Sequence, residues 1–167
     1  PFRHIRVRSS TYARRETGEK MIARAFCLQL NTRKAPEFID ITDWVCQCVA
    51  QSRITNGFAV VYSKHTTAAV KINENEPLLL EDMAHFLEKF SPRNGGYHHN
   101  DFSIRKVNMN PDESPNGHAH LQHLLLGSSE TVPVIDGSVQ FGRYQSVFFI
   151  EFYHPRAREV MVQVVGE

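Results

Sequence analysis

The stretch FAVVYSKHTTAAVKI, residues 58–72, decides the fold of this chain. Phe58–Tyr62 and Ala68–Ile72 are nearly unbroken apolar runs, and the polar segment Ser63–Thr67 separates them. Short apolar runs of this length are typical of strands that are buried on both faces. We therefore predict two core strands, with His65 in a functional bend or at a strand end between them.

An amphipathic helix is predicted before this pair of strands. Asp40 or Thr42 can cap its first turn, and Asn56-Gly57 follows its end. Its apolar residues recur at the spacing of one helix face: Ile41, Trp44, Val45, Cys48 and Val49. This spacing places Cys48 in the core and points Cys46 away from it, so no bond between the two cysteines is expected.

A second helix is predicted after the pair. Pro77 suits its first turn, and Ser91-Pro92 stops it. Its apolar residues again share one face: Leu79, Met83, Phe86, Leu87 and Phe90. We predict that it is a second core helix.

The flanking segments add strands and one short helix. Phe2–Arg8 and Met21–Leu30 read as a β-hairpin with its turn near residues 12–20. A helix over His118–Leu126 ends at Gly127, and strands are expected at Val147–Tyr153 and Glu159–Val165. The order of elements favours the α+β class, in one domain over residues 1–167.

Composition excludes several classes of protein. A hydrophobic fraction of 41% and a charged fraction of 22% are globular values, and no apolar run approaches the roughly 20 residues that span a bilayer. The net charge of +1 argues against a nucleic-acid partner. An odd number of cysteines, three, predicts a reducing cytoplasm. The sequence begins at Pro1 without methionine, so removal of an upstream peptide carrying an organelle address stays compatible with this expectation.

The segment Tyr97–His123 is rich in histidine. It contains His98, His99, His118, His120 and His123. Neutral imidazole is a common zinc ligand, and a catalytic metal site takes three protein ligands and leaves one position open. On a helix, His120 and His123 lie about 60° apart around the axis, whereas His118 points elsewhere. The alternative is that surface histidines have accumulated in a polar loop, residues 91–117, whose length is itself typical of functional or disordered segments.

Three carboxylates have two readings each. Glu74 can favour the start of the second helix or act as a base, and Asp82 can be a solvated charge or face a site. Glu151 lies within an apolar strand, where a charge is costly unless it is paired or placed at a site. Arg156 and Arg158 follow closely, and either can pair with Glu151 or bind phosphate.

Beyond these local readings, the chain resembles the YjbQ family, also called secondary thiamine-phosphate synthases. The resemblance covers Phe58 to Glu167, whereas the first 55 residues match in general pattern only. It rests on ordered elements: Lys64-His65-Thr66-Thr67, Asn73-Glu74-Asn75, Asp82-Met83, Tyr97 with His99, His120 seven residues before Gly127, and Gly137 through Gln145 to Glu151. Two departures are a longer loop between Asn100 and Gly117, and Tyr144 where tryptophan is common.

The resemblance implies a β-sandwich core with flanking helices, a homotrimer, and a polar site for a small phosphorylated substrate. It implies a divalent metal, zinc or magnesium, on His65, His99 and His120. The catalytic residues it points to are His65, Glu74, Asp82, Glu151 and, less securely aligned, Arg158. His98, His118 and His123 have no counterpart in the family pattern and are weaker candidates for site residues.

The implied reaction joins a pyrimidine diphosphate to a thiazole phosphate, which requires stabilisation of the departing phosphate charge. Two alternatives stay open at this point. The same residues with a metal can activate water and hydrolyse a phosphate or an ester, with Glu74 or Glu151 as the base. A trimeric module that binds a metabolite without converting it is the third possibility.

Overall fold

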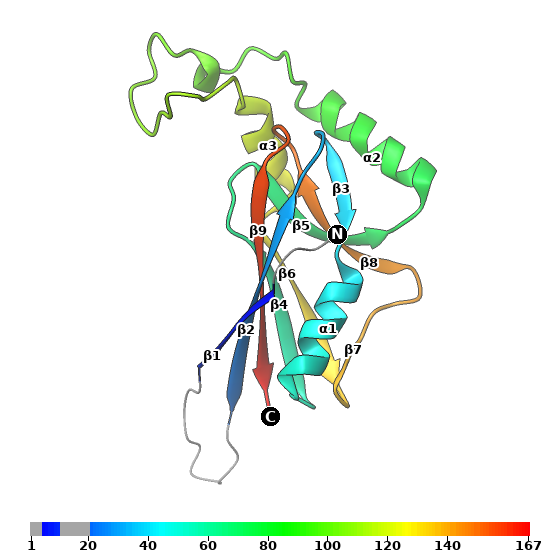
Figure 1. Ribbon diagram of the computed structural model, residues 1–167. Coiled ribbons are helices and arrows are strands. Elements are labelled where there is room, and N and C mark those ends of the chain that lie inside the picture. The colour runs from blue at the N-terminus through cyan, green and yellow to red at the C-terminus, as the bar shows by residue number, and fades with distance from the viewer. Residues whose placement is uncertain (1–4, 11–20) are drawn as a thin grey trace.

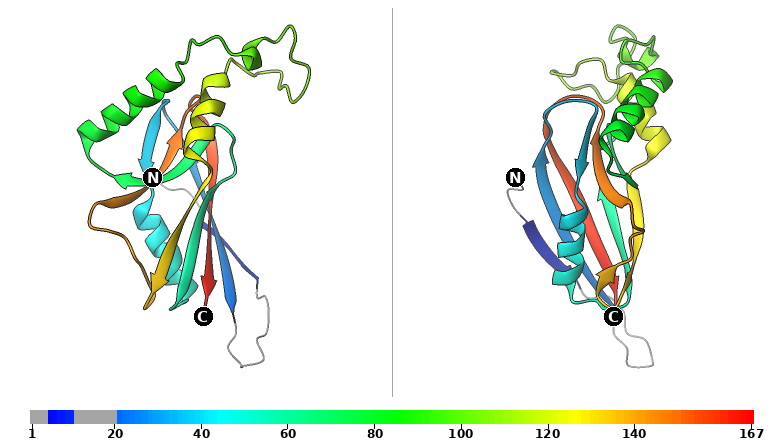
Figure 2. Two further views of the ribbon diagram at one scale, coloured as in Figure 1. Left: turned by 180° about the vertical axis from the view of Figure 1, so that it is seen from behind. Right: turned by 90° about the vertical axis from the view of Figure 1, so that its right-hand side faces the viewer.

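Two antiparallel sheets face each other and carry the chain (Figures 1 and 2). The computed structural model describes residues 5–10 and 21–167. The larger sheet has the order β1-β2-β9-β4-β6-β7, and the smaller one has the order β3-β8-β5. The bounds in the larger sheet are β1 Ile5–Ser10, β2 Ile22–Asn31, β9 Ala157–Gly166, β4 Gly57–Ser63, β6 Ser129–Ile135 and β7 Ser138–Val139. In the smaller sheet they are β3 Glu37–Asp40, β8 Gln145–Glu151 and β5 Ala68–Glu74. The expected α+β fold with a β-sandwich core is confirmed.

The predicted pair of core strands forms, and its two members belong to different sheets. β4 pairs with β6 and β9 in the larger sheet, while β5 pairs with β8 in the smaller one. The polar turn of residues 64–67 therefore crosses from one sheet to the other. Ala59 and Val61 of β4 and Ala68 and Val70 of β5 are fully buried between the layers.

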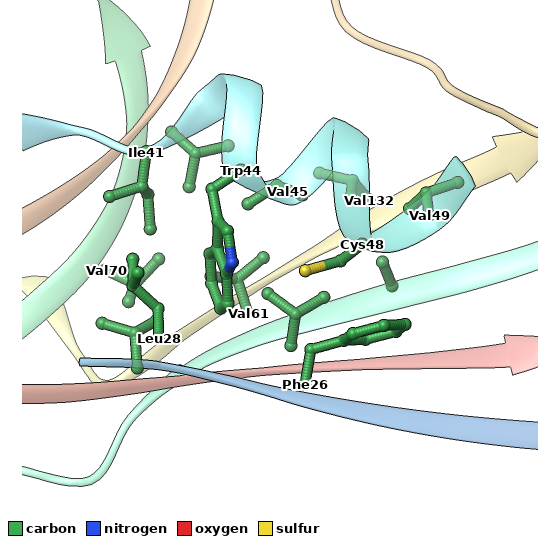
Figure 3. Close-up of a cluster of buried hydrophobic side chains, with 14 of the residues drawn as sticks. Phe26, Leu28, Ile41, Trp44, Val45, Cys48, Val49, Val61, Val70 and Val132 are labelled. Carbon is green, nitrogen blue, oxygen red and sulfur yellow. The ribbon is translucent and has the colours of Figure 1, made fainter. Parts of the chain in front are cut away.

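Helix α1, Thr42–Ser52, fills the space beside the smaller sheet, as its apolar stripe predicts. Trp44, Val45, Cys48 and Val49 are buried against both sheets (Figure 3). Burial of each such side chain contributes roughly 1.5–3 kcal/mol, so this one face anchors the helix. The carboxylate of Asp40 accepts hydrogen bonds from the backbone N–H and the hydroxyl of Thr42.

Helix α2, Pro77–Phe90, has the predicted bounds but not the predicted burial. The carboxylate of Glu76 caps it by accepting hydrogen bonds from the N–H groups of Leu78 and Leu79. Leu87 is its one buried residue, whereas Phe86 and Phe90 are 57% and 53% exposed. The expectation of a second core helix is therefore wrong for the single chain, because α2 lies on the outside of the smaller sheet (Figure 2) and exposes Phe86 and Phe90 to solvent.

Helix α3, Gly117–Leu126, packs beside the end of α2. The side-chain amide of Gln122 donates to the carbonyl groups of Leu87 and Ser91. Gly127 follows with a φ of 79°, as expected for the residue that ends the helix. None of the helices within residues 21–167 is long and apolar enough to cross a membrane.

The strands at the two ends of the chain match their predictions in outline. β1 pairs antiparallel with β2, while the predicted turn near residues 12–20 lies outside the described residues. β8 and β9 cover the two predicted C-terminal strands within a few residues. Strand β6 begins two residues after Gly127, and it includes Pro133 although proline is uncommon inside strands.

Candidate functional site

A polar cavity of about 830 Å³ opens at the end of the sandwich where β9 begins. One wall comes from the strands: the β4–β5 turn, residues 64–67, and the segment from Tyr153 to Arg158. The other comes from His99, His120 and residues 101–113, which we call the arm. Figure 1 shows the arm projecting from the body of the domain between α2 and α3. A cavity of this size can hold a small-molecule ligand.

Arg158 is held rigidly at the floor of the cavity. Its Nε and Nη2 atoms donate to the two carboxylate oxygens of Glu151 at 2.5 and 2.6 Å, and Nη2 also donates to the Thr67 hydroxyl at 2.9 Å. Both side chains of the ion pair are almost fully buried. Within the described chain, the hydrogen bonds of Arg158 use Nε and Nη2, so Nη1 can serve a ligand.

Glu151 is a positioning residue and does not fit the predicted role of a base. Besides Arg158, its carboxylate accepts hydrogen bonds from the Thr32 hydroxyl and from the Tyr153 backbone N–H. It is 0% exposed and is not part of the cavity lining. A carboxylate whose two oxygens are fully engaged cannot take a proton from a ligand that it does not reach. The predicted pairing of Glu151 with Arg158 is the reading that the structure bears out.

His65 faces the cavity with a fixed tautomer. Its Nε2 atom accepts a hydrogen bond of 2.9 Å from the backbone N–H of Glu159. Burial lowers the pKa of His65, and the neighbouring charge of Arg158 lowers it further. The ring is therefore neutral near pH 7, with its proton on Nδ1, where it can act as a donor.

His99 and His120 lie together in the wall opposite the strands. His99 belongs to the 3₁₀ turn His98–Asn100, and His120 belongs to α3. Their ring centroids are 4.7 Å apart at an interplanar angle of 70°. The His99 Nε2 atom is buried without a hydrogen-bond partner among the described residues, and Glu113 Oε1 lies 3.9 Å from it. Burial lowers the pKa of His120, as do the nearby charges of His99 and Arg105.

The arm is ordered by one arginine. Arg105 donates to both carboxylate oxygens of Glu113, with the closer pair at 2.5 Å, and to the backbone carbonyls of His99, Val107 and Asn108. The hydrogen bond from Arg105 lowers the pKa of Glu113, so this carboxylate is ionised at neutral pH. A long loop with its own buried ion pair is a structured element, so the disordered alternative for residues 91–117 does not apply to the arm.

Two fixed points hold the ends of the arm. At the first, the side-chain oxygen of Asn100 accepts hydrogen bonds from the backbone N–H groups of Asn116 and Gly117. A Cβ atom at Gly117 would lie 2.6 Å from Tyr97 Cβ, so only glycine permits this approach. At the second, the Tyr153 hydroxyl bonds to the backbone N–H and the carbonyl of Ser114.

A three-histidine metal site does not fit this arrangement. The lone pair of His65 Nε2 is occupied by the Glu159 N–H, and its Nδ1 carries the proton, so neutral His65 has no free donor atom for a metal. Within the described residues, no group of three or more His, Cys, Asp or Glu side chains lies close enough together to hold an ion. His99 and His120 alone are adjacent, and we derive no chemical step through a metal.

The structure brings four of the predicted site residues to one cavity: His65, His99, His120 and Arg158. Glu74 and Asp82 do not line it. The reason is the length of β5, because Glu74 lies six residues beyond Ala68, or roughly 20 Å at about 3.3 Å per residue. In the single chain these two carboxylates cannot act on a ligand in the cavity.

The remaining histidines of the segment have structural or exposed positions. His118 is buried, and its Nε2 atom bonds to the carbonyl of Phe152. His123 Nδ1 bonds to the carbonyl of Ala68 and so ties α3 to β5. His98 lines a shallow hollow outside the cavity. Their lower rank in the sequence analysis agrees with these positions.

Sequence reasoning missed several residues that line the cavity: Arg105, Asn108, Asn110, Asp112, Glu113 and Tyr153. Most of them belong to the arm, where the sequence has no strand or helix period that would orient a side chain. The one available signal was the unusual length of the loop. Lys64 lay in the quoted motif, and it forms an ion pair with Glu159 at the rim of the cavity.

Comparisons with known proteins give consistent matches. A sequence model of the family described as UPF0047 protein YjbQ-like matches residues 27–167. The UPF0047 protein of Methanothermobacter thermautotrophicus is 42% identical over 84% of this chain and 90% of its own length. That of Archaeoglobus fulgidus is 44% identical over 83% of this chain and 98% of its own length.

Solved structures match as well. A YbjQ-like protein of unknown function from Sulfolobus solfataricus has a TM-score of 0.79 and 32% identity, covering 88% of this chain and 99% of the other. A yjbq/upf0047 family protein from Clostridium acetobutylicum has a TM-score of 0.73 and 35% identity, covering 83% of this chain and 98% of the other. None of these names assigns a reaction.

Proposed function

Because the chain belongs to the UPF0047, YjbQ-like family, we propose that it is an enzyme of the secondary thiamine-phosphate synthase type. Its cavity would bind small phosphorylated substrates and join a pyrimidine diphosphate to a thiazole phosphate. The observation that carries this proposal is Arg158, a buried guanidinium that is pre-oriented by Glu151 and Thr67 and lines the cavity.

The strand wall supplies what a phosphate needs. Arg156 lines the cavity and forms no ion pair within the described chain, so its full charge is available to an anion. The Thr66 and Thr67 hydroxyls and the Nδ1 donor of His65 lie in the same turn. Charge-assisted hydrogen bonds from fixed donors are the strong ones, and they are stronger still where water is excluded.

The proposed reaction transfers the pyrimidine methylene group. The thiazole ring nitrogen forms a bond to the methylene carbon of the pyrimidine, while the bond from that carbon to the diphosphate oxygen breaks. The bonding electrons leave with the diphosphate. Arg158 and Arg156 would stabilise the charge that develops on the leaving oxygens, and a fixed cavity would align the nitrogen with the carbon.

A direct assay tests this function. The protein is incubated with the pyrimidine diphosphate, the thiazole phosphate and magnesium, and thiamine phosphate is measured by its fluorescence after oxidation. Arg158→Lys keeps the charge but loses the forked geometry, so kcat/KM should fall by roughly 100-fold. Arg143→Lys, on an exposed loop outside the cavity, is the matched control and should match the wild type.

Absence of thiamine phosphate from the wild-type reaction would reject the synthase. Tight binding of the substrates without turnover would instead identify a non-catalytic module that binds a phosphorylated metabolite. Equal activity of Arg158→Lys and the wild type would show that the reaction does not depend on Arg158 and takes place outside this cavity.

Hydrolysis of a phosphate ester is the second candidate, and the unpartnered His99 Nε2 atom favours it. His99 lines the cavity beside His120, so its ring could take a proton from a water bound there. A panel of phosphate esters and lactones, assayed with the wild type and with His99→Gln, distinguishes this reaction from the synthase.

We also propose that the protein assembles as a homotrimer. The support is an unusual amount of exposed apolar surface on the outer helices: Phe86 and Phe90 on α2, and Leu121, Leu124 and Leu125 on α3. Leu124 is 79% exposed, which is costly for a free surface and ordinary for an interface.

We further propose a cytoplasmic location, because Cys46 and Cys48 are thiols and thiols persist in a reducing compartment.

A further inference from the structure

We propose that Asp112 of the arm makes the cavity selective for certain ligands. These ligands carry a phosphate at one end and a hydrogen-bond donor, such as a ring amino group, at the other. The inference rests on the proposed function in one respect only, namely that the strand wall binds phosphate. It adds the chemistry of the rest of the ligand and assigns it to a segment that the sequence analysis left without a role.

The cavity is lined by charges of both signs. The strand wall contributes Arg156 and Arg158, whereas the arm contributes Asp112, the ion pair of Arg105 with Glu113, and the amides of Asn108 and Asn110. A site for a simple anion would gain nothing from Asp112, because its carboxylate repels phosphate. A ligand with a phosphate at one end and donors at the other matches both walls.

Among the carboxylates of the arm, Asp112 is the one available to a ligand. Both oxygens of Glu113 are engaged by Arg105, and one of them also accepts from the Asn110 N–H. Asp112 is exposed and forms no hydrogen bond or ion pair with any residue in the described part of the chain. An ionised carboxylate only accepts hydrogen bonds, so it selects for donors and against carbonyl groups.

The neighbouring ion pair makes this selection effective. Asp112 immediately precedes Glu113, which Arg105 fixes in a buried position with 9% of its side chain exposed. Asn110 on the other side is tied to Glu113 through its backbone. These contacts hold the backbone on both sides of Asp112, so less chain entropy is lost when its carboxylate binds a donor.

Calorimetric titration of the whole protein tests the inference with three probes: an aminopyrimidine monophosphate, its analogue with a keto oxygen in place of the amino group, and inorganic phosphate. The amino compound should bind about tenfold or more tightly than the keto compound, the usual effect of one hydrogen bond to a charged group. Inorganic phosphate should bind more weakly than the amino compound, since it contacts the strand wall alone.

Three variants assign the preference to its source. Asp112→Asn should bring the ratio of the amino and keto affinities close to one while inorganic phosphate binds within about twofold of its wild-type affinity. Arg156→Gln should weaken all three probes and preserve the ratio. Asp136→Asn, in the exposed turn between β6 and β7, is the matched control and should change neither quantity. Unfolding curves of each variant verify that it folds, and Asp112→Ser serves as a second test.

Equal affinities for the amino and keto compounds in the wild type would overturn the inference, and so would an unchanged ratio in both Asp112 variants or a failure of all three probes to bind. The reaction is judged separately. A protein that forms no thiamine phosphate but keeps the amino preference loses the proposed reaction and retains the specificity. One that forms thiamine phosphate with a ratio of one loses only the role of Asp112.

Discussion

Arg158 and Glu151 form a forked ion pair in a part of the core that solvent does not reach, with Nε and Nη2 at 2.5 and 2.6 Å from the two carboxylate oxygens. The pair joins β8 to β9, which belong to different sheets. It therefore links the packing of the sandwich to the cavity.

Glu151→Gln should lower the free energy of unfolding by about 3–5 kcal/mol, because it leaves the buried charge of Arg158 without a counterion. Urea denaturation measures the change. The matched control is Glu130→Gln, which breaks the partly exposed pair between Lys71 and Glu130 and should cost less than about 1 kcal/mol. A similar loss in both variants would show that burial of the Arg158 pair has no special weight.

The free energy of unfolding should decrease as the pH is lowered through the range in which histidine side chains titrate. Burial is the main cause that lowers the pKa of His65, His118 and His120 below the ordinary value of 6.5. As the pH drops below that value, the unfolded chain binds protons before the folded chain does, so the free energy of unfolding decreases until the folded-state pKa values are passed.

Urea denaturation between about pH 7.5 and 5 measures this loss, because carboxylates with lowered pKa values, such as Glu113, act only below about 4.5. His118→Gln removes one of the three groups, and its stability should depend less steeply on pH than that of the wild type. A wild-type curve that is flat across this range would contradict the expected burial of the neutral rings.

The apolar face of the outer helices should control assembly. Leu124→Glu places a charge at the most exposed leucine of α3 and should convert a trimer to monomers in light scattering. Ile135→Glu is the control, since Ile135 is 50% exposed on β6, away from α3. A wild-type protein that is already monomeric, or an equal response to both substitutions, would reject this face as the interface.

Removal of the Arg105 side chain should release the arm without unfolding the domain. Arg105→Ala deletes the bonds to Glu113 and to three backbone carbonyls, so chymotrypsin should cleave near Phe102 or Met109 at least about tenfold faster than in the wild type. Urea denaturation should change little. Arg105→Lys keeps the charge and loses the fork, and its cleavage rate should be intermediate. Identical cleavage rates in all three proteins would show that the hydrogen bonds of Arg105 do not order the arm.

Much of the fold could be predicted from local pattern. β4 and β5 were predictable because their apolar runs are nearly unbroken, and α1 because its apolar residues keep a helical period. That β4 and β5 join different sheets depends on pairing with β9 and β8, which lie about 100 and about 80 residues further along the chain. No local signal carries that information. The exposure of α2 was missed for a related reason, since an apolar stripe looks the same whether it covers a core or an interface.

The candidate site was predictable in part. His65, His99, His120 and Arg158 share one cavity, as the resemblance implied, whereas the roles of their atoms depend on contacts that only the fold supplies. The backbone N–H of Glu159 occupies the Nε2 atom of His65, and this contact joins residues far apart in sequence. Glu151 was correctly expected to need a partner, but whether it would be a base or an anchor for that partner depended on its burial.

The two fixed ends of the arm have a consequence for protein engineering. The contact of Asn100 with Gly117, and that of Ser114 with Tyr153, close the loop at its base and insulate the core from whatever lies between. Segments of other lengths and compositions could therefore be grafted between residues 101 and 113 on an unchanged scaffold. In the proposed function, the strand wall keeps its phosphate-binding residues while the arm is replaced, so new ligand preferences could be introduced without redesigning the sandwich.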